Sequence, residues 1–326
     1  MNLSKTLKSA IWISIFIVAV LFLIVKIHEY DVWFHLSAGK YILDNFKVPQ
    51  LDPFSYTASN SLYVDSHWLY QVILYIFYKT LGYFGIFLYQ FSVIGTIIFA
   101  LFRVGQKSNF YATTCCILLA LLIGNQRFLF RPEMFSYLFA VLFILILENR
   151  KKIYFLPLIQ ILWTNTHGFF VFGPIIIGCY FLGELIQKKQ IVKPLLLYGI
   201  LSVLACFINP YGYKLALYPL LLAKEVGESA SPFMKSVIEL APTFLTGIGS
   251  FYKSAFTILI VISFLSFFAA KKFFISRFLV YLLFLYVSFI AVRNTSFFAF
   301  VAALITIINF EEIKILHTSK EERHKE

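Results

Sequence analysis

The 326-residue chain is too apolar for a soluble globular protein, because 60% of its residues are hydrophobic and 13% are charged, whereas soluble domains carry roughly 25% charged residues. Its net charge of +12 comes from basic residues at the ends of apolar runs, where they orient helices and meet anionic headgroups, so we expect no nucleic acid partner. The pattern predicts an all-α integral membrane protein that crosses the bilayer several times and contacts membrane lipids.

The first apolar run follows Lys5 and Lys8 and extends from Ala10 to Val25. A basic start before an apolar stretch is typical of a signal sequence, but no small-x-small cleavage site follows. We therefore predict an uncleaved membrane helix over residues 10–27, followed by a first external loop over 28–68.

The first external loop begins with the sequence Asp31-Val-Trp-Phe-His35. If residues 31–45 form a helix, Asp31 lies at its start and His35 lies one turn later on the same face. A partly desolvated carboxylate at the membrane surface would act as a catalytic base. In the alternative interpretation, Asp31 only caps the helix.

The rest of this loop is rich in oxygen and imidazole groups. Asp52-Pro-Phe-Ser55 is typical of a turn, and Asp65 and His67 lie at the end of the loop. Together with His35, these side chains would position substrates or Asp31, and a divalent metal is a possible cofactor. No fixed metal-ligand spacing is present, and exposed loops often carry such residues without an ion, so no cofactor is certain.

The remaining apolar runs complete a predicted bundle of about ten transmembrane helices, a single domain over residues 1–310. The later predicted spans are 81–102, 110–124, 133–147, 153–163, 168–186, 194–208, 254–270, 277–291 and 296–310. Residues 69–78 and 215–223 are too short to cross and are predicted to lie at the interface. Basic clusters fall on alternate loops, which places both termini and a short tail, 311–326, in the cytoplasm and a larger external loop at 209–253.

Three arginines from distant parts of the chain, Arg127, Arg131 and Arg293, fall at the external ends of predicted helices. Arginine is disfavoured on that side, and guanidinium groups bind phosphate, so we expect them to hold a lipid-linked phosphate. The alternative is that they only reach toward lipid headgroups. Asn165 and His167, in a turn on the same side, are predicted to line the same cavity, although a histidine at such a turn is more often structural.

Several motifs resemble a bacterial family of GT-C-like membrane proteins that is grouped with dolichyl-phosphate-mannose-type and lipid A-modifying glycosyltransferases. The matching segments are Asp31–Gly39, Val48–Ser55, Asp65–Leu69, Arg131–Glu133, Trp163–Gly168, Asn209–Gly212 and Arg293. The resemblance implies a GT-C fold in the bacterial cytoplasmic (inner) membrane. It also implies a catalytic aspartate at Asp31, a polyprenyl-phosphate-linked sugar donor and an inverting transfer. The Glu-Trp pair of related members is absent, since Leu240 follows Glu239.

The sequence therefore predicts a membrane glycosyltransferase that acts on the extracytoplasmic side, and it leaves the sugar open and the acceptor as a lipid, a glycan or a protein. Two alternatives are a flippase for lipid-linked glycans and a non-catalytic membrane scaffold. A flippase would carry ionisable residues near the middle of its helices, whereas Glu184 lies near the cytoplasmic end of its apolar run.

Overall fold

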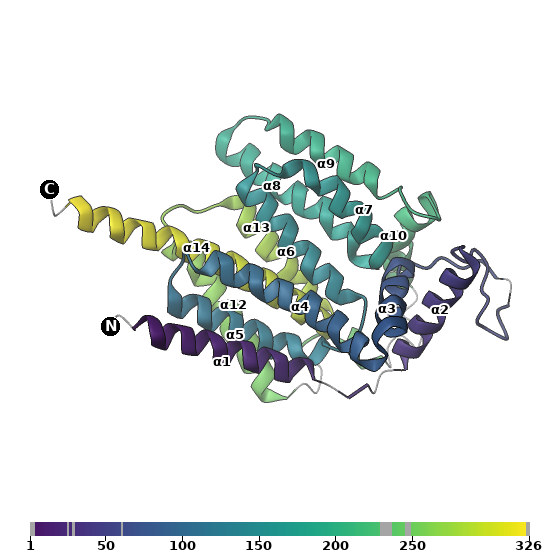
Figure 1. Cartoon of the computed structure of the whole chain (residues 1–326). Helices are drawn as coiled ribbons and strands as arrows, with labels where there is room; N and C mark the ends of the chain where they lie inside the picture. Colours follow the sequence, from purple (N-terminus) through teal and green to yellow (C-terminus); the bar gives the residue numbers. More distant parts are fainter. Residues whose placement is uncertain are drawn as a thin grey trace. The chain divides into compact units, whose positions relative to one another are not determined.

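The computed structural model describes residues 4–24, 26–27, 30–59, 61–228, 237–244 and 249–323, and these form helices joined by loops (Figure 1). Within the described residues there is no strand, and Leu51 and Leu62 form one isolated antiparallel bridge. Five helical segments are long and apolar enough to cross a membrane: Lys5–Leu23, Tyr83–Gly105, Gly168–Lys188, Ser250–Ala269 and Val292–Glu312. The chain is thus a helical membrane protein.

The contacts divide the chain into two compact units, which are described separately. Unit 1 comprises Met1–Lys26, Phe91–Leu129 and Val237–Glu326, and unit 2 comprises Ile27–Gln90 and Phe130–Ser236. Helix α4 (Tyr83–Gly105) contributes residues to both.

Unit 1 is organised around its last helix. Its elements besides part of α4 are α1 (Lys5–Leu23), α5 (Phe110–Gly124), η1 (Asn125–Arg127), η4 (Ile238–Leu240), α12 (Ser250–Ala269), α13 (Ile275–Ile290), η5 (Val292–Asn294) and α14 (Thr295–Arg323). Helix α14 packs against α5, α12 and α13, and its residues from Phe297 to Ile305 are fully buried. Because this part of the helix is apolar on every side, burial among other helices suits it.

Helices α12, α13 and α14 are joined by a buried polar network. The Thr306 hydroxyl donates to Ser263 Oγ at 2.9 Å, and the Asn309 amide donates to Ser266 Oγ at 2.9 Å. The Arg277 guanidinium donates to Asn309 at 3.1 Å and to the Glu312 carboxylate at 2.8 Å. Buried polar groups need such partners, so the network fixes how the three helices align.

Unit 2 contains the predicted first external loop and the helices from the middle of the sequence. Its elements besides part of α4 are α2 (Asp31–Asn45), α3 (Trp68–Leu81), α6 (Glu133–Asn149), η2 (Ile153–Phe155), α7 (Leu156–Thr166), η3 (Gly168–Val171), α8 (Phe172–Lys188), α9 (Lys193–Ala205) and α10 (Tyr213–Glu228). The helix predicted over residues 31–45 is confirmed with the same bounds.

Helix α2 packs tightly on α3 at Gly39. A Cβ atom at this position would overlap the Gln71 carbonyl oxygen and would lie 2.8 Å from the Cβ of Tyr75. Only a glycine lets the two helices approach this closely. The contact fixes α2, and with it Asp31 and His35, against α3.

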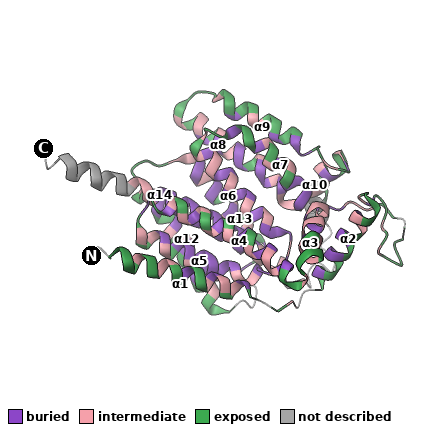
Figure 2. Ribbon diagram, in the orientation of Figure 1, coloured by how far each residue is buried: buried purple, intermediate pink, exposed green. Residues whose placement is uncertain are grey.

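Several helices carry large apolar residues that are exposed, and Figure 2 colours much of α1 and α9 as exposed. On α9 the exposed residues include Leu196, Leu197, Ile200, Val203 and Leu204. Contiguous apolar surface of this kind is costly in water but favourable against lipid tails. The exposed faces therefore agree with a membrane environment.

Five of the ten expected crossings correspond to helices that are long and apolar enough to cross a membrane. Each expected span coincides with a helix, but α7 has 11 residues and at 1.5 Å per residue is about 16 Å long, against about 30 Å of bilayer hydrocarbon. The first helix ends at Leu23 rather than at residue 27. At the other end, α14 runs through the expected tail to Arg323.

Candidate functional site

Asp31 and Arg131 meet in unit 2. Asp31 is the first residue of α2, and its Oδ2 lies 3.6 Å from Nη2 of Arg131, which precedes α6. The Asp31 side chain is 60% exposed and that of Arg131 is 16% exposed. The position before Asp31, Tyr30, makes no side-chain capping hydrogen bond. The Asp31 carboxylate thus faces a guanidinium group and remains open to solvent on its other side.

His35 lies one turn after Asp31 and is buried. Burial lowers the pKa of His35 to about 3, and the charge of His67 lowers it further. Asp65 raises this pKa by less than His67 lowers it, and Arg131 has the smallest effect, which lowers it. The ring is therefore neutral at neutral pH. Its Nδ1 lies 3.3 Å from the side-chain amide nitrogen of Gln71, so Nδ1 accepts this hydrogen bond and the ring proton resides on Nε2.

Asp65 orients His67 at the start of α3. Asp65 Oδ1 accepts a 2.8 Å hydrogen bond from the His67 backbone N–H and lies 3.3 Å from His67 Nδ1. Burial raises the pKa of Asp65, but hydrogen bonds from His67 and Gln71 and the charge of His67 outweigh it, so the pKa is lowered overall. The ionised carboxylate accepts a hydrogen bond from His67 Nδ1–H and thereby orients the ring.

Three imidazole rings form a row through this cluster. The ring centroids of His35 and His67 are 6.0 Å apart, and those of His67 and His167 are 5.5 Å apart. His167 is fixed at the far end, because Trp163 Nε1 donates to Ser136 Oγ at 2.8 Å and Ser136 Oγ lies 2.8 Å from His167 Nδ1. His167 Nδ1 also accepts from the Phe169 backbone N–H at 3.3 Å, so Nδ1 carries no proton and the Ser136 hydroxyl donates to it.

Asn165 joins three segments of unit 2. Its Oδ1 accepts from Trp68 Nε1 at 2.8 Å, while its Nδ2 donates to the carbonyls of Ile161 at 2.7 Å and Ile208 at 2.9 Å. These contacts connect the start of α3, helix α7 and the segment after α9. The amide therefore positions the histidine row, and direct contact of Asn165 with a substrate stays a prediction.

The turn predicted at Asp52 is confirmed. Asp52 Oδ1 accepts hydrogen bonds from the backbone N–H groups of Phe54 at 2.8 Å and Ser55 at 3.0 Å. Hydrogen bonds from the Ser55 side chain and from these two N–H groups lower the pKa of Asp52. The loop is also attached to the Asn209–Gly212 turn, because the Tyr211 hydroxyl donates to the Pro49 carbonyl at 2.9 Å. Asp52 is thus occupied in holding the shape of its own loop.

The other two predicted phosphate-binding arginines belong to unit 1. Arg127 ends η1, and its Nη1 lies 2.7 Å from Glu239 Oε2. Arg293 lies in η5, directly before α14. Because Arg131 belongs to unit 2, the convergence of all three arginines stays a prediction.

Sequence reasoning missed three polar residues that build the cluster: Gln71, Tyr70 and Ser136. Tyr70 is fully buried, and its hydroxyl donates to the Phe130 carbonyl, next to Arg131. Gln71 and Ser136 are fully buried within apolar stretches. A polar residue in such a stretch is costly unless it has a partner, which is the sequence signal that would have indicated them.

Among the residues that the structure describes, no group of three or more His, Cys, Asp or Glu side chains is close enough to hold a metal ion. A divalent metal at this site stays a prediction. No family model matches this chain, and a search of curated proteins gives no significant match. The chemistry of unit 2 must therefore be inferred from its own geometry: an acid, a guanidinium group and an orientated imidazole brought together from distant segments.

Proposed function

We propose that this protein is a GT-C-type membrane glycosyltransferase, which transfers a sugar from a polyprenyl-phosphate donor to an acceptor on the extracytoplasmic side with inversion. The observation that carries the proposal is the 3.6 Å approach of the Asp31 carboxylate to the Arg131 guanidinium. A base and a phosphate-binding group at this spacing are the two functions that such a transfer needs. The proposed setting is a bacterial cytoplasmic membrane, crossed about ten times, with both termini in the cytoplasm.

In the proposed reaction, Asp31 accepts the proton of an acceptor hydroxyl as its oxygen attacks the anomeric carbon of the sugar. The bond between that carbon and the donor phosphate oxygen breaks, and the lipid phosphate leaves with the bonding electron pair. Arg131 binds this phosphate, because guanidinium groups hold phosphate oxygens through two parallel hydrogen bonds. A phosphate bound to Arg131 competes with Asp31 for the N–H groups of the guanidinium. Binding of the sugar donor therefore releases the Asp31 carboxylate for its role as base.

The histidine row and its partners support this arrangement. Neutral His35 lies within the field of Arg131, and Gln71 and the Asp65–His67 pair hold the rings in place. We assign to these groups the positioning of the acceptor and of Asp31. In the proposal Arg127 and Arg293 are further phosphate-binding residues, and the acceptor is a lipid, a glycan or a protein.

The decisive experiment is transfer of radiolabelled sugar from a polyprenyl-phosphate donor by purified full-length protein. We expect Asp31→Asn to lower the transfer rate roughly 10²–10⁴-fold, the usual contribution of a general base. Asp44→Asn is the matched control, because Asp44 is exposed near the other end of the same helix. Full activity in Asp31→Asn would rule out this base and direct attention to His67 with Asp65.

The same preparation separates the proposal from the two alternatives. A flippase would move a lipid-linked glycan across a vesicle membrane without transferring its sugar, and a scaffold would do neither. Glu184, the clearest acid within an apolar run, is paired with Arg150 and lies 3.1 Å from Lys188. Such pairing leaves it poorly suited to couple an ion gradient to transport.

A further inference from the structure

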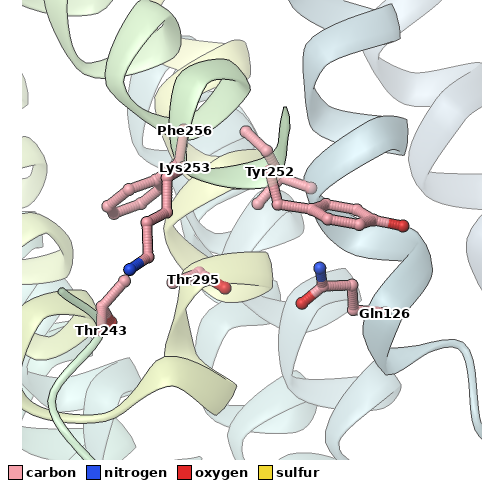
Figure 3. A pocket seen from close by; sticks show the side chains of 7 residues that line it. Gln126, Thr243, Tyr252, Lys253, Phe256 and Thr295 are labelled. Atoms are coloured by element: carbon pink, nitrogen blue, oxygen red, sulfur yellow. The ribbon is translucent and has the colours of Figure 1, made fainter. Parts of the chain in front are cut away.

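Unit 1 has a small pocket of its own, distant in sequence from Asp31 and its partners. Figure 3 shows the pocket, whose polar lining includes Gln126, Tyr252, Lys253 and Thr295 and whose apolar wall includes Ile123 and Phe256. It has an empty volume of about 260 Å³ including its mouth, but its interior holds only about 10 Å³, the space of one water molecule. The interior therefore admits one oxygen-sized group, and a larger group such as a phosphate would be held at the mouth of the pocket.

Lys253 gives this pocket a positive charge. Its Nζ donates a long 3.4 Å hydrogen bond to the Phe244 carbonyl, and it makes no ion pair with any residue that the structure describes. Glu239, an acid of the same unit, pairs at 2.7 Å with Arg127 and not with Lys253. Lys253 therefore remains available to an external anion.

A second hydrogen-bond donor lies in the same lining. Thr295 lies between Lys253 and Gln126 in Figure 3. Within the described chain the Gln126 side-chain amide forms no hydrogen bond. The Tyr252 side chain is held in place at one side of the pocket, because its hydroxyl donates to Asn125 Oδ1 at 3.1 Å. Lys253 and Gln126 thus offer N–H donors to a guest that accepts hydrogen bonds.

The helices around the pocket indicate its depth in the membrane. Lys253 lies in the first turn of α12, and Thr295 begins α14, so two helix N-termini lie at the pocket, while α5 ends there next to Gln126. The segments Ser250–Ala269 and Val292–Glu312 are both membrane-span candidates. Ends of membrane spans lie at the level of the lipid headgroups, and helix N-termini favour anions.

We propose that this pocket binds the phosphate group of an anionic membrane lipid, with Lys253 as its cation and Gln126 as a second donor. The glycerol and acyl chains of this lipid stay outside the pocket, because its interior has room for only one water-sized group. A free phosphate compound would offer the same oxyanion without chains embedded in the membrane. The proposal does not depend on sugar transfer, because Asp31, Arg131 and the histidine row take no part in it.

The test is lipid binding to the detergent-solubilised full-length protein, measured by native mass spectrometry. The probes are phosphatidylglycerol, diacylglycerol, which lacks the phosphate, and inorganic phosphate as a competitor. We expect Lys253→Gln to weaken phosphatidylglycerol binding roughly tenfold or more, because a charge-assisted hydrogen bond is lost. Lys253→Arg should stay within about threefold of the wild type, since the charge and donors remain. Lys271→Gln, an exposed change just beyond the other end of α12, is the matched control and should bind as the wild type does.

Equal binding of phosphatidylglycerol by the wild type and Lys253→Gln, or no preference over diacylglycerol, would overturn the proposal. Lys253-dependent binding of inorganic phosphate without any preference for phosphatidylglycerol would overturn the assignment to a lipid. If Lys253→Gln does not fold, Gln126→Leu decides the matter. Its loss of phosphatidylglycerol binding by about threefold would support the site, and unchanged binding in this variant would contradict it.

Discussion

Buried polar side chains serve two different ends in the two units of this protein. In unit 1, Ser263, Ser266, Thr306 and Asn309 are at most 1% exposed and bind one another across α12 and α14. In unit 2, buried His35 and His167 adjoin groups that reach solvent, since the His67 side chain is 34% exposed and that of Asp31 is 60% exposed. A closed network fixes packing, whereas a network with open ends can exchange protons and bind ligands. The comparison assigns stability to the first and chemistry to the second.

The largest expected effect concerns the closed network. Arg277→Met removes the partner of Glu312 and Asn309, and breaking a buried ion pair should lower the free energy of unfolding by about 3 kcal/mol. SDS-induced unfolding of the purified protein measures this loss. Sugar transfer per folded molecule should not change. A specific loss of transfer in this variant would remove the distinction between the two networks.

The open network should respond in the opposite way. Arg131→Gln should lower kcat/KM for the polyprenyl-phosphate donor roughly 100-fold, because a charge-assisted contact with the phosphate is lost. Its effect on unfolding should be smaller than that of Arg277→Met, since the partner Asp31 is largely exposed. Arg131→Lys retains the charge without the paired donors and should lie between Arg131→Gln and the wild type. If Arg131→Gln lowers the stability of the protein while its folded fraction keeps full activity, the assignment of Arg131 to phosphate binding is contradicted.

His35 gives unit 2 a predicted dependence of stability on pH. Its pKa is about 3 in the folded protein and about 6.5 when unfolded, so only the unfolded chain takes up this proton as the pH falls below 6.5. The titration of His35 should therefore lower the free energy of unfolding by about 1.4 kcal/mol for each unit by which the pH falls between 6.5 and 3.

His35→Asn retains an acceptor for Gln71 and removes this titration. The difference in stability between this variant and the wild type, measured from pH 7.5 to pH 5, should follow that slope. Parallel curves for the two proteins would show that folding does not change the pKa of His35.

The smallest expected effect concerns Asp52. Asp52→Asn keeps an Oδ1 atom that accepts from Phe54 and Ser55, so the turn should persist and transfer should stay within about twofold of the wild type. Asp52→Ala loses that acceptor and should lower the melting temperature. A tenfold or greater loss of transfer in Asp52→Asn would show that the Asp52 carboxylate has a role beyond holding the turn.

Hydrophobic runs and turn chemistry were sufficient to predict most helices, because apolar periodicity and Asx turns depend on local sequence. The helix over 31–45 and the turn at Asp52 are examples. The pairings were not predictable in this way. Asp31 and Arg131 were each singled out, yet their contact depends on how α2 and α6 pack, as does the pairing of Arg127 with Glu239.

Lys253 is a residue whose proposed role could not be predicted from the sequence. In the sequence it is an ordinary lysine at the start of an apolar run, where the usual role is to orient the helix. Its pocket exists only because residues from four segments surround it. Which residues surround Lys253 depends on how the helices pack in the folded protein, and this cannot be read from spacing along the chain.

The close packing of α2 on α3 at Gly39 has a consequence for evolution and engineering. Gly39 lies about two turns, or about 12 Å, from Asp31 along the same helix. A single methyl group at Gly39 would act as a wedge against the Gln71 backbone, and a tilt of α2 would be magnified at its far end. The alignment of Asp31 with Arg131 can therefore be lost through a change at a residue that touches neither.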